Sequence, residues 1–186
     1  MTYPRLLPSH AQLLREGTVI PAHPLALTKE RKLDERRQKL LTQYYIASGA
    51  GGVAVGVHTT QFEIRKPEIN LLEPVLKLAS DQIRDSNPER PFLKVAGIVG
   101  KTAQALREAE LAVKYGYHLG LVSMGGLNDL SESDLIKRLE AIAQIIPVFG
   151  FYLQPAVGGR LLSYDFWKEA AALPNLYAIK VAALNR

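Results

Sequence analysis

The chain has 186 residues, of which 47% are hydrophobic, a formal net charge of +5 and no cysteine. This length and composition predict one domain with one sizeable core, and no apolar run approaches the roughly 18–20 residues that a membrane-spanning helix needs. The lack of cysteine excludes disulfides and thiolate metal sites and fits a cytoplasmic protein, while basic residues dispersed among acidic ones argue against a nucleic-acid-binding face.

Strand-like and helix-like patterns alternate along the chain. The segment 17–23 predicts a strand, and apolar residues at helical spacing predict a helix over 33–49. A continuous apolar run at 52–57 suits a strand buried on both faces. Then come a helix at 67–86 opened by Pro67, a strand at 92–100, a helix at 101–116 that ends at Gly116, a strand at 118–124, a helix at 131–145 with Ser131 as N-cap, a strand at 147–153, a helix at 163–173 and a strand at 176–181.

Six strands alternating with five helices predict an α/β protein, because parallel strands need crossover connections. A doubly wound sheet and a (β/α)8 barrel both have this order. No glycine-rich dinucleotide-binding motif follows the first strand, which weighs against the doubly wound sheet. In a barrel, the chemistry lies at the carboxyl ends of the strands. Those places hold His23, the segments 58–61, 99–102, 123–128 and 152–155, and Lys180.

Lys180 lies inside the apolar strand pattern at 176–181. A lysine in apolar surroundings loses hydration and tends to lose its charge, which makes its amine nucleophilic. The alternative is that the long side chain reaches from the strand end into water.

Three segments in order carry a resemblance to a known family. They are "GAGGVAVGVHTTQF" at 49–62, "FYLQPAVGG" at 151–159 and "PNLYAIKVA" at 174–182. Together they resemble the dihydrodipicolinate synthase / N-acetylneuraminate lyase superfamily of class I aldolases, from about Gly17 to the end of the chain. The family has a G-T-T-G-E loop at the first place, Y-N-x-P-x-x-x-G at the second, matched at Tyr152, Pro155 and Gly159, and N-x-x-G-x-K at the third, matched at Lys180.

The resemblance implies a (β/α)8 barrel of which about six strand–helix units are present. We therefore expect an N-terminal extension at 1–16 and a partial, apparently truncated barrel at 17–186. It also implies that Lys180 forms an imine with pyruvate or another 2-oxo acid, that Tyr152 shuttles protons, and that the protein is a homo-oligomer without a cofactor or metal.

The segment His58–Gln61 allows two alignments with the family loop. Without a gap, Thr59 matches the second threonine and acts as a catalytic residue, His58 replaces the first threonine and Gln61 replaces the glutamate. A shift of one residue aligns Thr59 and Thr60 with the pair. In both alignments the loop offers groups that suit the carboxylate of a 2-oxo acid, and in both the threonines could instead cap the following helix.

Two departures concern the substrate. Val157 stands where the synthases have an arginine, and "MGGLN" at 124–128 replaces their P-Y-Y-N loop, which argues against aspartate semialdehyde as second substrate. We expect His23, Gln154 and the motif glycine Gly159 to contact a different substrate, with local packing as the alternative for the first two.

Two other functions stay open. A non-catalytic barrel relative could bind a 2-oxo acid or serve as a regulator, which the unusual loops at 58–61 and 124–128 would suit. A phosphate-handling protein is suggested by "GIVGKT" at 97–102, although the first glycine of a P-loop is missing.

Overall fold

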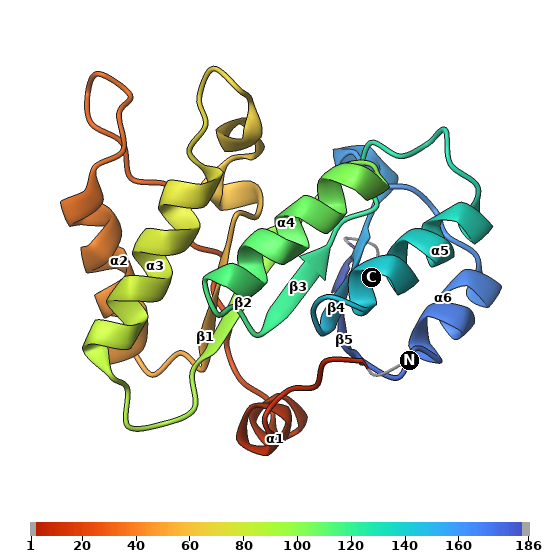
Figure 1. The fold of residues 1–186 in the computed structure, drawn as a ribbon, viewed down its shortest axis with the longest axis horizontal. Helices are drawn as coiled ribbons and strands as arrows, with labels where there is room; N and C mark the ends of the chain where they lie inside the picture. The colour runs from red at the N-terminus through yellow and green to blue at the C-terminus, as the bar shows by residue number, and fades with distance from the viewer. Residues whose placement is uncertain (1–2, 184–186) are drawn as a thin grey trace.

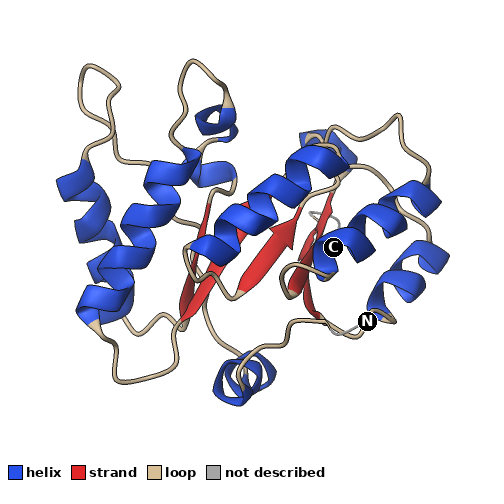
Figure 2. Ribbon diagram, viewed as in Figure 1, coloured by secondary structure: helices blue, strands red, loops and turns tan. Residues whose placement is uncertain are grey.

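Five parallel strands form one sheet in the computed structural model, which describes residues 3–183 (Figures 1 and 2). The strands are β1 (Gly52–Val55), β2 (Leu93–Ile98), β3 (Leu119–Val122), β4 (Val148–Leu153) and β5 (Leu176–Ala182). Each pairs with the next along the chain, in the order β1-β2-β3-β4-β5. This sequential parallel order confirms the predicted α/β class and is that of consecutive strands in a barrel.

The helices follow the predicted alternation. They are α1 (Pro8–Glu16), α2 (Glu35–Ala47), α3 (Leu72–Ser86), α4 (Thr102–Lys114), α5 (Glu132–Ala143) and α6 (Tyr164–Ala171), with short 3-10 helices at His58–Thr60, Phe62–Arg65 and Pro155–Val157. Ser131 caps α5 as predicted, because its side chain accepts a hydrogen bond from the Asp134 N–H. None of the helices within residues 3–183 is long and apolar enough to cross a membrane.

The helix predicted at 67–86 begins five residues later, at Leu72. Pro67 lies in a turn before it, and Asn70 has a left-handed φ of 46°. A left-handed residue cannot continue a right-handed helix, so α3 starts only after Asn70.

The strand predicted at 17–23 is reduced to a single parallel bridge between Ala22 and Ala54. The His23 N–H donates to the Ala54 carbonyl at 2.8 Å, and the Ala54 N–H donates to the Pro21 carbonyl at 2.9 Å. Pro21 has no N–H to donate toward Gly52, so the regular ladder is interrupted there. One further backbone bond follows, from the Gly51 N–H to the Val19 carbonyl at 3.0 Å. The sheet therefore has five strands, and the segment 17–23 lies along the free edge of β1.

The N-terminal extension contains a helix, α1, that the sequence analysis did not predict. Pro8 occupies its first turn, a favoured position for proline. The His10 ring stacks on His118 with 4.1 Å between ring centroids, and the Leu6 N–H donates to the Tyr177 hydroxyl at 3.2 Å. These contacts place α1 at the end of the sheet where the strands begin (Figure 1). Residues 1–2 and 184–186 of the predicted segments lie outside the described residues.

The sheet has two apolar faces. Helices α2–α6 cover one face, where most of the buried core lies. The other face, here called the inner face, carries a second cluster that corresponds to a barrel interior. Its buried members are Leu6, Ala54, Val57, Leu93, Val95, Leu119 and Leu121, with Phe149, Phe151 and Tyr177 packed against them.

Gly97, near the end of β2, has no room for a side chain. A Cβ built there would lie 2.4 Å from the Gly56 carbonyl oxygen, a backbone atom that can move only with its strand. We expect Gly97→Ala to lower the free energy of unfolding by about 3 kcal/mol in chemical denaturation. Gly150→Ala is the matched control, because its Cβ would meet the flexible Ile179 side chain at 3.3 Å. Equal losses in the two variants would contradict this account.

Candidate active site

A β-bulge in β5 determines where Lys180 points. Val148 pairs with Leu176, but Phe149 pairs with Ala178, so Tyr177 is one extra residue in β5. Such a bulge changes the face to which the following side chains point. Beyond it, Lys180 pairs with Phe151, and both lie on the inner face.

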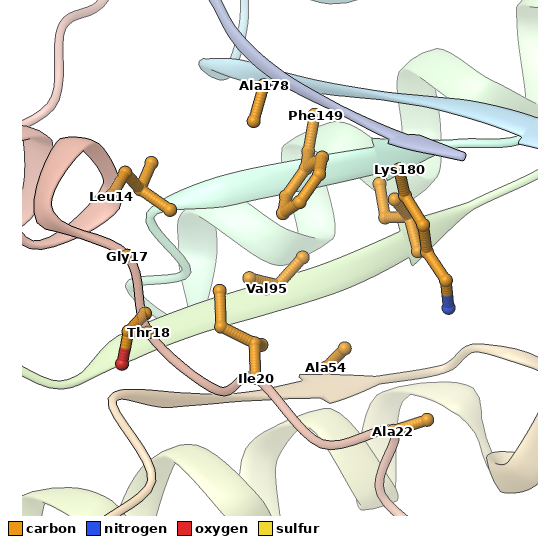
Figure 3. A pocket seen from close by; sticks show the side chains of 11 residues that line it. Leu14, Gly17, Thr18, Ile20, Ala22, Ala54, Val95, Phe149, Ala178 and Lys180 are labelled. Carbon is orange, nitrogen blue, oxygen red and sulfur yellow. The ribbon is translucent and has the colours of Figure 1, made fainter. Parts of the chain in front are cut away.

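Lys180 lies at one end of a cavity of about 390 Å³ on the inner face (Figure 3). Leu14 and Thr18 lie at the other end. Among the described residues that line the cavity, Lys180 is the one with an ionisable side chain; the others are Leu14, Gly17, Thr18, Ile20, Ala22, Ala54, Val95, Leu121, Phe149 and Ala178. The half-buried Lys180 places its Nζ 5.2 Å from the centroid of the Phe151 ring, so the amine faces an aromatic ring.

The same lysine also lines a hollow of about 20 Å³ at the carboxyl ends of the strands, here called the lysine hollow. Its other lining residues are Gly56, Val57, His58, Phe62, Gly97, Val99, Leu121, Ser123 and Phe151. The exposed His58 thus lines the same hollow as Lys180. Ser123, which is 9% exposed, joins them from the end of β3.

Tyr152 does not lie beside Lys180 on the inner face. Tyr152 pairs with Val181, one position beyond Lys180, and successive residues of a strand point to opposite faces. Its ring instead packs edge-on against Trp167 of α6, with 6.2 Å between centroids. The predicted proximity of the two side chains is therefore corrected. The spacing of 28 residues between Tyr152 and Lys180 (180 − 152) does not reveal the bulge. Because of the bulge, Lys180 pairs with Phe151 instead of lying beside Tyr152.

Three of the four residues of the His58–Gln61 loop do not line the lysine hollow. The buried Thr60 hydroxyl donates to the His23 carbonyl at 2.6 Å and accepts from the Gly56 N–H at 3.0 Å. The Thr59 hydroxyl donates to the same carbonyl at 3.2 Å. Gln61 is exposed and has a left-handed φ of 72°. The two threonines thus hold the loop in shape through His23 and Gly56, and the helix that follows has no side-chain cap hydrogen bond from them.

His23 is fully buried and packs against α2, so the structure does not place its side chain at the mouth of the barrel. Its Nε2 lies 2.9 Å from the Thr42 hydroxyl, and Gln38 hydrogen-bonds Nδ1. Both ring nitrogens are thus engaged by α2. The packing alternative describes His23 better than the predicted substrate contact.

Gln154 and Gly159 shape the turn after β4. The Gln154 carbonyl accepts from the Gly159 N–H at 3.1 Å. A Cβ on Gly159 would lie 1.8 Å from the Leu153 carbonyl oxygen, so only glycine fits this close approach. Neither residue lines the lysine hollow.

A larger cleft of about 560 Å³, here called the outer cleft, adjoins the lysine hollow. The two share Phe62, Val99 and Ser123. Arg65 also lines this cleft, and the sequence analysis gave no signal for it. Ser123, by contrast, lies in the segment 123–128 that follows a predicted strand. Within residues 3–183, no group of three histidine, aspartate or glutamate side chains is placed to hold a metal ion.

The fold matches solved structures of two kinds of enzyme. The dihydrodipicolinate synthase of Oceanobacillus iheyensis aligns at 17% identity and a TM-score of 0.78, over 95% of this chain and 56% of that one. The N-acetylneuraminate lyase of Fusobacterium nucleatum gives 17% identity and a TM-score of 0.75, over 90% and 56%. The chloride-inhibited dihydrodipicolinate synthase of Acinetobacter baumannii, complexed with pyruvate, gives 23% and 0.76, over 89% and 55%.

No protein-family model and no curated protein matches the chain. The chain therefore has the fold of the dihydrodipicolinate synthases and N-acetylneuraminate lyases, which are (β/α)8 barrels, and it spans about 55% of the length of the structures that it matches. This likeness confirms the predicted partial barrel.

The burial of His23 predicts a pH dependence of stability. Burial lowers the pKa of His23 from 6.5 to about 4, so between these values the unfolded chain takes up a proton that the folded chain does not. The contribution of neutral, buried His23 to the free energy of unfolding is fully present above pH 6.5. We expect the free energy of unfolding to fall by about 3 kcal/mol as the pH is lowered to about 4.

Urea unfolding at several pH values tests this expectation. His23→Gln should remove about that much of the acid-induced loss, while His58→Gln, which changes an exposed ring, is the matched control. Burial also lowers the pKa of His118, so His118 adds the same acid-induced loss of stability in the unmodified protein and in both variants. The same pH dependence in His23→Gln and in the unmodified protein would contradict the assignment.

Proposed function

We propose that this chain carries the imine-forming lysine of a class I aldolase-type lyase that acts on pyruvate or another 2-oxo acid. The observation that carries the proposal is the position of Lys180, between an apolar cavity and the lysine hollow at the carboxyl ends of the strands. Active sites of barrel enzymes lie at this end. The matched folds belong to synthases and lyases, one of them complexed with pyruvate.

In the proposed reaction, the neutral Lys180 amine attacks the keto carbon of the 2-oxo acid. The carbinolamine then loses its hydroxyl group as water and becomes a protonated imine, which draws electrons from the neighbouring carbon. Departure of the hydroxyl needs a proton donor. His58 and Ser123 line the same hollow as Lys180, so we assign the proton transfers to them. The substrate carboxylate lies against the His58–Gln61 loop, whose shape Thr59 and Thr60 maintain.

The orientation of Tyr152 favours a second candidate. A barrel relative without a phenol beside the lysine could bind a 2-oxo acid, even as an imine, without turning it over. Such a protein would serve as a binding or regulatory protein. Turnover of a bound 2-oxo acid, measured without borohydride, separates the two candidates, because only the enzyme releases a changed product.

The resemblance also leads us to propose a homo-oligomer. The proposal of a cytoplasmic location rests on the absence of cysteine. Neither property enters the mechanism above, and sedimentation of the purified protein tests the first.

Borohydride reduction in the presence of pyruvate tests the role of Lys180. We expect one stable adduct on the peptide that contains Lys180, because reduction converts an imine into an amine that no longer hydrolyses. Lys180→Ala should abolish this adduct in peptide mass spectrometry. Lys168→Ala, which removes an exposed lysine on α6, should leave the adduct unchanged. An adduct that forms equally well without Lys180 would refute the proposal.

The orientation of Tyr152 gives a second prediction. Because its ring packs against α6, Tyr152→Phe should change the rate of adduct formation by less than about twofold. Ser123→Ala should slow adduct formation by roughly tenfold, the effect of losing one hydrogen bond to a charged group. A loss of roughly 10²–10⁴-fold in Tyr152→Phe would instead assign the proton transfer to Tyr152.

A further inference from the structure

The outer cleft has an arginine with an unused donor. The Arg65 side chain is 8% exposed, and its Nε donates to Glu108 at 3.0 Å. Its Nη2 donates to the carbonyls of Gly56 and Gly97 at 2.9 and 3.0 Å. The third nitrogen, Nη1, has no hydrogen-bond partner among residues 3–183. A buried guanidinium donor without an acceptor is costly, and Arg65 lines the cleft.

A second buried arginine, Arg138, contacts the backbone of a residue that lines this cleft. Arg138 of α5 is 1% exposed and donates from Nε to the Gly100 carbonyl at 2.9 Å. Its Nη2 likewise finds no partner in the described part of the chain. Burial lowers the pKa of Arg138 to about 10, so the group is charged at neutral pH. Glu108 is the one carboxylate among the buried residues of 3–183, so two buried guanidiniums share a single acid.

Helix α4 begins at the same cleft. Gly100, Lys101 and Gln104 line the cleft, and the free N–H groups at the start of a helix attract anions. Lys101 is 70% exposed, and its Nζ lies 2.8 Å from the exposed Asp129 carboxylate. An exposed pair of this kind is weak, so Lys101 can turn to a bound anion. Gly100 and Lys101 belong to the segment 97–102, which resembled the end of a P-loop but here follows β2 of the parallel sheet.

Phe62 connects the outer cleft to the lysine hollow. It lines both spaces, is 45% exposed, and its ring centroid lies 5.9 Å from the Arg65 Cζ. The Phe62 ring thus lies against the Arg65 guanidinium at the point where the two spaces adjoin. A ligand held at Lys180 could then extend past Phe62 to the arginine.

We infer that the outer cleft binds a second anionic group, a carboxylate or a phosphate, of a ligand whose 2-oxo acid end reacts at Lys180. Arg65, Lys101 and the first turn of α4 supply the positive charge and the donors. The link to Lys180 rests on the proposed function, whereas anion binding in the cleft does not depend on it.

Calorimetric titration with inorganic phosphate and, separately, with glutarate tests the anion site. Neither probe has a keto group, so neither can form an imine, and the two arms distinguish a phosphate site from a carboxylate site. We expect at least one probe to bind, and Lys101→Glu to weaken its binding by about tenfold or more. Lys137→Glu is the matched control, because it reverses an exposed charge on α5 (72% exposed) outside the cleft.

Arg65→Gln should also weaken binding, but this variant loses contacts to Gly56 after β1, to Gly97 in β2 and to Glu108 in α4, and can fail to fold. The comparison of Lys101→Glu with Lys137→Glu therefore decides the outcome. If neither probe binds the unmodified protein, or if the two charge reversals weaken binding equally, the inference is wrong.

Borohydride trapping with 2-oxoglutarate and with pyruvate tests the link to Lys180. Lys101→Glu should lower trapping of 2-oxoglutarate by about tenfold relative to pyruvate. An unchanged ratio would overturn the link. If no pyruvate is trapped on Lys180 but Lys101→Glu still loses the anion, the proposed function fails and the anion site stands.

Discussion

The one-residue bulge at Tyr177 is the constraint on which the candidate site depends. Leu176 packs on the helix side of the sheet, and without the extra residue Lys180, four positions later, would point to that side as well. The bulge turns it to the inner face, where the cavity and the lysine hollow meet. Side chains alternate along β4, so Tyr152, which follows the inward-facing Phe151, points to the helix side and packs against α6. A single backbone irregularity thus selects which aromatic ring, that of Phe151, faces the amine.

The loop after β1 is held from two sides by side chains rather than by the sheet. Pro21 interrupts the backbone pairing of the segment 17–23 with β1, and the buried network of His23, Gln38 and Thr42 adds to it. The Thr60 hydroxyl then joins the His23 carbonyl to the Gly56 N–H. His23 and Thr60, which were predicted to contact substrate, thereby hold the loop after β1 in place.

The sequence predicted the alternating elements because each signal is local. The apolar run of β1 and the Ser131 cap of α5 depend only on nearby residues. The edge segment at 17–23 and the start of α3 could not be predicted well, because Pro21 and Asn70 act through backbone geometry. Lys180 was found through its apolar strand and its motif.

The relation of Tyr152 to Lys180 was missed because the bulge depends on the packing of two strands, which no residue count reveals. Arg65 was missed for a similar reason, since two of its partners are backbone carbonyls, one just after β1 and one in β2, which meet it only in the folded chain. The single tryptophan, Trp167, packs against Tyr152 and Phe166 on the helix side of β4. Its fluorescence therefore monitors the docking of α6. The cavity and the hollow of the inner face contain no tryptophan among their described lining residues, so a ligand bound there does not touch this fluorophore.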